Sequence, residues 1–294
     1  MDLSIIIVNY KTPKLCENCI KSICNTLDGV AIDYEVVLVD NNSGDNSFSI
    51  LKKLNGENIR VIETEKNGGF GYGNNRGAEI AKGDLYFFLN SDTILYESVL
   101  LRMIDQMKSD SSIGVMGCLM VDGQDRALVT AHSFENTRSL FIQTIIKPFI
   151  PKFIKKTRGS IFLDSHTGMT ECDWVSGAAM LMRRTVFEEV GGWNEKYFLY
   201  MEDEELCYRI RSKGYKVILY PEVGLQHLVS MSGGSAFSAY QRYKSKMIYY
   251  HDTDLNHYRI NRMLLLLQAR QYMKNLPNGE KKDVISKLKE IHYE

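Results

Sequence analysis

Near its start the chain carries the run that decides its fold class, Ser4-Ile5-Ile6-Ile7-Val8-Asn9-Tyr10. Its β-branched residues are uninterrupted, which is typical of a strand buried on both faces of a parallel sheet. Similar runs follow at residues 36–39 and 85–89, and all three end in polar residues, Asn9, Asp40 and Asn90 among them. In such sheets the carboxyl ends of the strands meet at the edge where ligands bind. The three runs therefore predict a sheet with a ligand site along one edge.

Helical patterns separate these strands, at residues 13–27, 46–54 and 73–82. Pro13 suits a first helical turn, with Thr12 as its N-cap. The alternation of strand and helix predicts a doubly wound α/β fold with right-handed crossovers. Residues 121 to about 235 are less regular but contain a strand-like run at 172–183, and residues 236–294 are predicted to be helical.

The composition excludes several classes of protein. The 294 residues contain 36 Lys and Arg and 36 Asp and Glu, a formal net charge of +0. A neutral chain is a poor candidate for nucleic-acid binding, which rests on many phosphate contacts. With 44% hydrophobic and 24% charged residues, the chain has the composition of a folded globular protein. Six cysteines do not make a disulfide scaffold in a chain this long, and we interpret Cys16 and Cys19 as small apolar residues of one helix.

The sequence predicts a cytoplasmic protein. No apolar run approaches the ~18 residues of a spanning helix, and the N-terminus lacks the basic region of a signal peptide. Between Glu135 and Asp164 there is no acidic residue, and cations alternate with large apolar residues from Arg138 to Arg158. This segment is either a solvated loop with an apolar anchor or a basic amphipathic segment. The second interpretation predicts contact with the inner face of the cell membrane or with an anionic lipid substrate.

A glycine-rich stretch precedes the third helix, Asn67-Gly68-Gly69-Phe70-Gly71-Tyr72-Gly73-Asn74-Asn75-Arg76-Gly77. Glycines let a backbone approach a phosphate or ribose closely, and the following helix offers free N–H groups. A dinucleotide-binding fingerprint does not fit, because Arg76 or Asn74 takes the place of its third glycine and the loop does not follow the first strand. The chain also lacks a Walker A motif.

Three further groups of residues could carry chemistry. Asp92, in Asn90-Ser91-Asp92, follows a strand and could bind a divalent cation or only cap the next helix. Four acids, Glu202-Asp203-Glu204-Glu205, crowd the first turn of a predicted helix. The helix dipole favours acids there, but four adjacent like charges also suit a metal or acid–base role. His227 could act together with these acids, although a single histidine is usually structural.

In this order the motifs resemble the family 2 glycosyltransferases with a GT-A fold. They look most like the bacterial rhamnosyltransferase-like branch, which builds surface polysaccharides, and the resemblance covers roughly residues 3–232. It implies an α/β fold with a Rossmann-like, mixed but mostly parallel sheet flanked by helices. It also implies a catalytic domain at residues 1–235, with a nucleotide-binding half to about 120 and an acceptor half from about 121. Residues 236–294 would form a C-terminal helical extension.

The resemblance also implies roles for individual residues. Asp203 would be the general base, and Asp92 and His227 would bind Mg²⁺ or Mn²⁺. Asp40 would contact the nucleobase, and Asn90 replaces the first acid of the family's D-x-D motif, so it adds no charge. Further implied contacts to the nucleotide sugar are Asn9, Asn67, Gly71 and Asn75, and those in the donor and acceptor pocket are Trp174, Ser176, Gly177 and Glu202.

The implied activity is an inverting, metal-dependent transfer of a hexose or rhamnose from a nucleoside-diphosphate sugar to a hydroxyl of a glycan or lipid-linked acceptor. A non-catalytic nucleotide-sugar or polysaccharide-binding module is the alternative, and it would not need Asp203 or His227. A nucleotidyltransferase would need a glycine-rich loop after the first strand, and Asn9-Tyr10-Lys11-Thr12-Pro13 contains no glycine. We therefore expect a glycosyltransferase.

Overall fold

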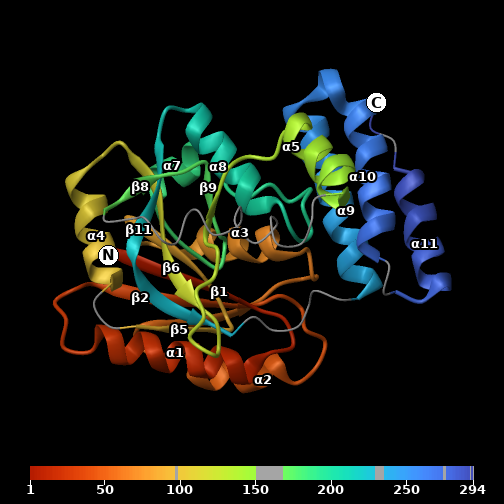
Figure 1. Cartoon of the computed structure of the whole chain (residues 1–294). Coiled ribbons are helices and arrows are strands. Elements are labelled where there is room, and N and C mark those ends of the chain that lie inside the picture. Colours follow the sequence, from red (N-terminus) through yellow and green to blue (C-terminus); the bar gives the residue numbers. More distant parts are fainter. Residues whose placement is uncertain (97–98, 150–167, 229–234, 274–275, 292, 294) are drawn as a thin grey trace.

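The computed structural model describes residues 1–96, 99–149, 168–228, 235–273, 276–291 and 293. A nine-stranded sheet has the order β3-β2-β1-β4-β10-β6-β11-β5, with β8 paired to β11 (Figure 1). Its strands are β1 (Leu3–Asn9), β2 (Tyr34–Asp40), β3 (Ile59–Glu63), β4 (Leu85–Asn90), β5 (Thr93–Leu95), β6 (Ile113–Val121), β8 (Thr170–Glu171), β10 (Ala179–Arg183) and β11 (Lys216–His227).

The sheet is parallel at one end and mixed at the other. The first four strands, β3, β2, β1 and β4, are parallel. Strand β10 runs antiparallel to both β4 and β6, while β6 and β11 are parallel to each other. Strands β5 and β8 are antiparallel to β11. The prediction of a mixed sheet with a parallel N-terminal part is confirmed.

Helices cover both faces of the sheet (Figure 1). The helices α1 (Pro13–Leu27), α2 (Ser47–Leu51) and α4 (Val99–Ser109) pack on one face. The helices α3 (Phe70–Ile80), α7 (Arg184–Glu189) and α8 (Glu202–Ser212) pack on the other. Along β1, Ile5 and Ile7 face the first group and Ile6 faces the second, and all three are fully buried. The expectation of strands buried on both faces is thus confirmed.

Two glycines of the stretch 67–77 have a packing role that the sequence did not predict. Helix α3 begins at Phe70, three residues before the predicted start, so several of these glycines lie inside it. A Cβ atom on Gly73 would lie 2.7 Å from Cγ1 of Val8, and one on Gly77 would lie 2.5 Å from Cγ2 of Ile6. These two glycines therefore allow the helix to pack closely on β1.

Two other predicted elements are interrupted. The expected helix at 46–54 is α2 followed by a single 3₁₀ turn (Lys52–Leu54). The strand-like run at 172–183 divides into β9 (Trp174–Val175) and β10, with a turn between them in which Ala179 N donates to Ser176 O at 3.3 Å. Strand β9 pairs with β7 (Ala131–His132) in a separate two-stranded sheet.

The C-terminal part is helical, as predicted, and lies beside the sheet (Figure 1). It contains α9 (Ala236–Thr253), α10 (Tyr258–Tyr272) and α11 (Asn278–Lys289), and α5 (Thr137–Phe141) packs against α10. Helix α5 continues into a π-helical turn (Ile142–Ile146) and a 3₁₀ turn (Lys147–Phe149). A third apolar cluster fills this part, and Leu140, Tyr197 and Met201 join it from outside the C-terminal helices.

The remaining expectations concern cysteines and membranes. All six cysteines are free, and Cys16 and Cys19 are fully buried on α1. Burial raises the pKa of the Cys19 thiol to about 12, which agrees with a role as a small apolar residue. No helix in the described ranges combines the length and hydropathy needed to cross a bilayer. Of the basic segment, Lys152, Lys155, Lys156 and Arg158 lie outside the described residues.

Candidate active site

A cavity of about 740 Å³ opens at the carboxyl ends of β1 and β4 and is closed by the start of α8 and the first turn of α9. This is the edge of the sheet where the sequence predicts a ligand. The predicted site residues on its lining are Asn67, Asn90, Asp92, Ser176, Gly177, Glu202, Asp203 and His227. Residues separated by more than one hundred positions in the chain thus share one cavity.

Asp203 occupies the second position of α8 and is held by backbone groups. Its Oδ2 atom accepts a hydrogen bond from Gly177 N at 3.0 Å, and its Oδ1 atom accepts one from Glu204 N at 3.0 Å. Burial raises the pKa of Asp203, while these two N–H groups favour the ionised form and oppose that shift. A Cβ atom on Gly177 would come within 3.3 Å of Cβ of Asp203, so the glycine lets the turn approach the carboxylate.

The backbone leading into α8 is strained. Tyr200 and Met201 have φ values of 71° and 70°, so two successive residues other than glycine adopt the left-handed conformation. Such residues cost about 1–3 kcal/mol each and concentrate at functional sites. The strained pair sets the direction in which Glu202 and Asp203 enter the cavity wall.

Glu202 is a buried carboxyl group on the cavity lining. Its side chain is 7% exposed, and its Oε2 atom has no hydrogen-bond partner among the described residues. Burial raises the pKa of Glu202 well above its usual range, and the neighbouring charge of Asp203 adds to the effect. Two adjacent carboxyl groups therefore differ in environment, because Asp203 has two N–H donors and Glu202 is left with an unsatisfied oxygen.

The pairing of β5 with β11 brings Asp92 and His227 together. His227 lies opposite Thr93 in this pair, and Nε2 of His227 is 3.2 Å from Oδ1 of Asp92. Nδ2 of Asn90 is 3.5 Å from the same imidazole nitrogen. No group of three His, Cys, Asp or Glu side chains that could hold a metal occurs in the described part of the chain. A cation held by Asp92 and His227 would have to take its other ligands from substrate and water.

A network of hydrogen bonds lies beneath the cavity at the ends of β1 and β2. Asn9 Nδ2 donates to Oδ1 of Asp40 at 2.5 Å, and Ser43 Oγ donates to the same oxygen at 2.6 Å. Asp40 and Asn9 are buried and absent from the lining, whereas Asn41 lines the cavity. Asn41 Nδ2 donates to the Gly69 carbonyl oxygen at 2.9 Å, which ties the loop after β2 to the start of α3. Asp40 and Asn9 therefore lie outside the lining of this cavity, and their contact with the nucleotide stays a prediction.

The comparison with known families agrees with this arrangement: residues 4–191 match the glycosyl transferase family 2. The chain belongs to this family. The matched range contains the parallel strands, the residues beneath the cavity, and Asp92, and it ends before α8.

Relatives of this family 2 chain include three proteins at low identity. The low-salt glycan biosynthesis hexosyltransferase Agl10 of Haloferax volcanii is 27% identical over 74% of this chain and 64% of its own, so less than two thirds of that protein is matched. The rhamnosyltransferase WbbL of Escherichia coli (strain K12) is 26% identical over 78% and 86%. The N-acetylglucosaminyl-diphospho-decaprenol L-rhamnosyltransferase of Mycobacterium tuberculosis is 25% identical over 68% of each chain.

Solved structures share the fold. The mannosyltransferase PcManGT of Pyrobaculum calidifontis, in complex with GDP-Man and Mn²⁺, aligns with a TM-score of 0.59 and 14% identity over 99% of this chain and 76% of its own. GalNAc-T7 with UDP, GalNAc and Mn²⁺ aligns with a TM-score of 0.62 and 15% identity, over 98% of this chain and 55% of its own. The family 2 chain therefore has a GT-A fold.

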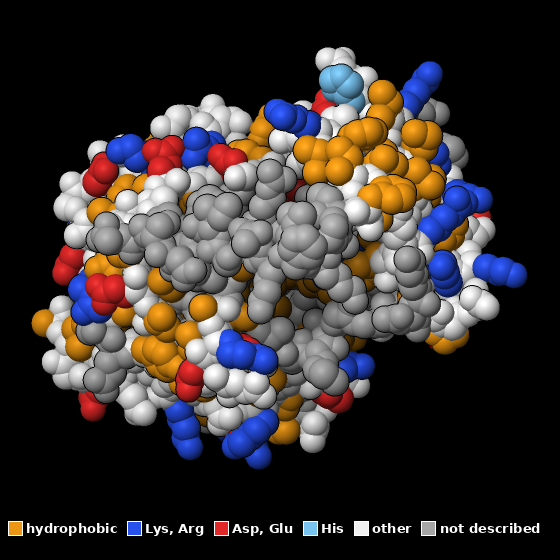
Figure 2. Space-filling model, viewed as in Figure 1, with side chains coloured by type: hydrophobic (Ala, Val, Ile, Leu, Met, Phe, Trp, Pro, Cys, Tyr) orange, Lys and Arg blue, Asp and Glu red, His pale blue; other side chains and the backbone are white. Residues whose placement is uncertain are grey.

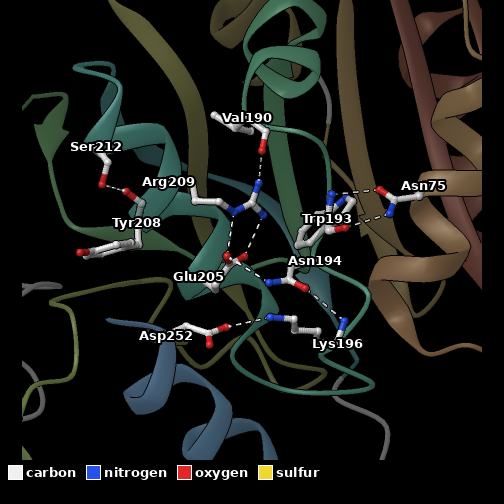
Figure 3. A network of polar contacts seen from close by, with 10 residues as sticks. All are labelled: Asn75, Val190, Trp193, Asn194, Lys196, Glu205, Tyr208, Arg209, Ser212 and Asp252. Carbon is white, nitrogen blue, oxygen red and sulfur yellow. Dashed lines mark hydrogen bonds and ion pairs between the residues drawn. The ribbon is translucent and has the colours of Figure 1, made fainter. Parts of the chain in front are cut away.

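Besides Asp40 and Asn9, three further predicted site residues are absent from the cavity lining of the family 2 chain. Asn75 is paired with the backbone of Trp193, donating to its carbonyl oxygen and accepting from its N–H, each at 2.9 Å (Figure 3). Gly71 packs on the same tryptophan, since a Cβ atom on it would lie 3.0 Å from Cβ of Trp193. Trp174 stacks on His132, with ring centroids 4.1 Å apart. These residues join elements together outside the lining, and their contact with the nucleotide sugar stays a prediction.

The network around Trp193 also anchors α8. Arg209 binds Glu205 through two of its nitrogens, at 2.7 and 2.8 Å, and donates to the carbonyl oxygen of Val190 (Figure 3). Glu205 is one of the four acids predicted to share a metal or acid–base role. This contact shows that it instead holds the helix that carries Asp203.

Sequence reasoning missed several aromatic residues on the lining. Tyr10 is 45% exposed at the end of β1, and Tyr200 lines the opposite wall. Phe237 of α9 is 55% exposed and packs edge-on against Phe198, with ring centroids 5.8 Å apart. Tyr10 could have been found from its position directly after a strand. No sequence signal pointed to Phe237, because its place depends on how α9 packs.

Proposed function

We propose that the protein is an inverting glycosyltransferase that moves a sugar from a nucleoside-diphosphate sugar to a hydroxyl of a glycan or lipid-linked acceptor in surface polysaccharide synthesis. Family membership and the names of the relatives support sugar transfer. One observation carries the proposal. Asp203 and the Asp92–His227 pair line the same cavity, so a base and a cation site face one bound donor.

The donor nucleotide would lie over the carboxyl ends of β1 and β4. The exposed ring of Tyr10 offers a flat apolar surface for a nucleobase, and Asn41 and Asn67 supply amides on the same lining. Asp40 and Asn9 would act from below, because their hydrogen bonds fix the end of each strand. We therefore assign them a positioning role.

Asp92 and His227 would hold a divalent cation beside the donor diphosphate. One carboxylate oxygen and one imidazole nitrogen suit Mn²⁺ better than Mg²⁺, which prefers oxygen ligands. When bound, the ion would act as a Lewis acid that stabilises the negative charge of the leaving diphosphate. Asn90 contributes no charge, so we expect weak metal binding in the absence of nucleotide.

Asp203 would accept the proton of the attacking hydroxyl. Its raised pKa makes it a stronger base than an ordinary carboxylate, and the N–H groups of Gly177 and Glu204 keep it ionised and oriented. Glu202, neutral because of its burial, would donate a hydrogen bond to a sugar hydroxyl. In a single displacement the acceptor oxygen bonds to the anomeric carbon while the bond to diphosphate breaks on the opposite face, which inverts the anomeric centre.

Residues 1–235 would form the catalytic domain, with a nucleotide-binding half to about 120 and an acceptor half from about 121. Residues 236–294 would form the helical extension. Phe237 and Ser238 of this extension lie on the cavity lining. The extension would therefore complete the acceptor side of the site.

The test is to incubate the protein with a panel of nucleotide sugars and to follow nucleoside-diphosphate release, with thermal shift as a separate readout of binding. We expect one donor both to stabilise the protein and to be turned over, with turnover dependent on a divalent cation. A donor that stabilises the protein but is not turned over with any acceptor would favour the alternative, a non-catalytic binding module.

A further inference from the structure

Two stretches of the chain that lack acidic residues lie side by side in the helical part. Residues 137–149 and residues 255–273 contain neither Asp nor Glu. Thr137 Oγ1 donates to Oδ1 of Asn261 at 2.8 Å, and Gln271 Nε2 donates to the carbonyl oxygen of Thr144 at 3.2 Å. The α5 segment and α10 are therefore joined along their length, although more than one hundred residues separate them in sequence.

The two stretches turn different residues inward and outward. Leu140 and Thr144 are almost fully buried, and Leu265 of α10 is buried in the same apolar cluster as Leu140. Large apolar side chains remain on the outside. The exposed members are Phe141 at 46%, Ile146 at 43% and Phe149 at 86% in the α5 segment, with Ile260 at 50% and Met263 at 56% in α10.

The same surface carries positive charge. Arg138, Lys147, Arg259 and Arg270 are exposed, and none of them forms an ion pair with a residue that the structure describes. Asp254, at the end of α9, is engaged by Thr137, by Asn261 and by His257. Figure 2 shows hydrophobic side chains gathered over the region that α5 and α10 occupy in Figure 1, with basic side chains around them. We call this region the α5–α10 surface.

We propose that the α5–α10 surface docks on an anionic lipid bilayer, with its apolar side chains inserted shallowly between headgroups. Single exposed apolar residues need no explanation. A group of them on two segments that contain cations and no acid is complementary to a bilayer, which is apolar inside and negatively charged at its surface. A protein partner would need acidic side chains placed opposite these cations and pockets for the exposed apolar side chains. An anionic bilayer supplies both negative charge and an apolar interior, so we favour the bilayer.

Docking there would serve the proposed reaction. Helix α9 links the surface to the cavity, because Phe237 and Ser238 at its start line the cavity while Tyr250 near its end donates to the Asn136 carbonyl oxygen, just before α5, at 3.2 Å. A bilayer at the surface would hold the site beside acceptors carried on lipid. This second step rests on the proposed function, whereas bilayer binding itself does not.

The decisive experiment measures sedimentation of the full chain with vesicles of phosphatidylcholine, with and without phosphatidylglycerol. We expect binding only to the anionic vesicles, weakened by added salt. Replacing Arg138, Lys147, Arg259 and Arg270 with Gln should weaken binding by about fivefold for each cation removed. The variant Phe149→Ser with Met263→Ser should weaken it at high salt as well, because it removes the apolar contribution.

The matched control replaces Lys14, Lys21, Lys53 and Lys82 with Gln, which changes net charge equally at exposed sites elsewhere. The control should bind vesicles as the wild type does. Equal loss in both variants, or no binding of the wild type to anionic vesicles at low salt, would overturn the proposal. Concentration-dependent dimers that Phe149→Ser abolishes, without vesicle binding, would overturn it in favour of a second copy of the chain.

Turnover of a water-soluble donor and acceptor separates this inference from the proposed function. The surface variant should retain that turnover in the absence of vesicles, because none of its four cations lines the cavity. A wild type that binds anionic vesicles but releases no nucleoside diphosphate would contradict the proposed function alone. A wild type that turns over donor but ignores vesicles would contradict the docking surface alone.

Discussion

The two walls of the cavity are built in different ways. The wall at the ends of β1, β2 and β4 consists of parallel strands followed by amides, hydroxyls and the carboxylates of Asp40 and Asp92, with Asp40 hydrogen-bonded to Asn9 and Ser43. The wall at the start of α8 contains adjacent buried carboxyls, a strained backbone and the unsatisfied oxygen of Glu202. The polar groups beneath the first wall are paired with one another, whereas the second wall keeps an unpaired carboxyl oxygen among the described residues.

Asp203→Asn, at the start of α8, should lower turnover while leaving donor binding intact. We expect turnover to fall by a factor of ~10² or more, because the amide cannot accept the proton, while donor affinity and melting temperature stay near their wild-type values. Stopped assays of nucleoside-diphosphate release and calorimetry with the donor measure the two effects. Asp105→Asn, an exposed change on α4, is the control, and a rate within a few-fold of wild type for Asp203→Asn would remove the base assignment.

His227→Gln tests the role of the cation separately from that of the base Asp203. Chelator should abolish wild-type turnover, and Mn²⁺ should restore it better than Mg²⁺. In the variant, the Mn²⁺ concentration for half-maximal turnover should rise about tenfold or more, because one of two protein ligands is lost. Mn²⁺ titration in the presence of nucleoside diphosphate measures this directly. Full wild-type activity in excess chelator would rule out the cation.

Asp40→Ala tests whether Asp40 supports the fold or contacts the ligand directly. Its removal leaves Asn9 and Ser43 without their buried acceptor, which should cost about 1–3 kcal/mol of unfolding free energy. We expect a lower melting temperature together with weaker binding of nucleoside diphosphate. Asn41→Ala, which changes a lining residue, should weaken binding more than it lowers the melting temperature. If Asp40→Ala weakens nucleoside-diphosphate binding without lowering the melting temperature, Asp40 contacts the ligand directly.

Glu204→Gln should have the smallest effect and concerns pH. Burial, and then the charge of Glu135, raises the pKa of Glu204 to about 8 in the folded protein, above its usual value in the unfolded chain. The folded state therefore holds a proton that the unfolded state releases, so Glu204 contributes stability at low pH that is lost as pH rises toward 8. The loss is at most about 1.4 kcal/mol per pH unit. Melting temperatures measured between pH 4 and pH 9, a range that spans both pKa values, should depend less on pH in the variant; an identical pH dependence would contradict this.

The difference between the walls also explains what the sequence could predict. The strands β1, β2 and β4 have local sequence patterns. Uninterrupted apolar runs such as residues 5–8 and 36–39 were sufficient to predict them. The first helix coincides with its prediction, residues 13–27, because Pro13 marks its start. These features depend on residues close together in the chain.

The sequence was less informative where distant segments meet. The glycine-rich stretch predicted a nucleotide contact for Asn75, but it gave no sign of the hydrogen bond to Trp193, more than one hundred residues away. The glycines of α3 suit a phosphate-binding loop by their sequence, but two of them pack on Val8 and Ile6 of β1. Phe237 could not be predicted at all, since only the packing of α9 brings it to the cavity. Tertiary contacts of this kind leave no local pattern.

Helix α9 has a consequence for how such enzymes could be recombined. Its first turn forms part of the cavity wall, and its last turns hold the loop before α5. A hybrid made by joining the first 235 residues to another relative's helices would therefore exchange part of the active site along with the surface. We expect the helical extension and the catalytic domain to be inherited as one unit, with acceptor choice and docking surface changing together.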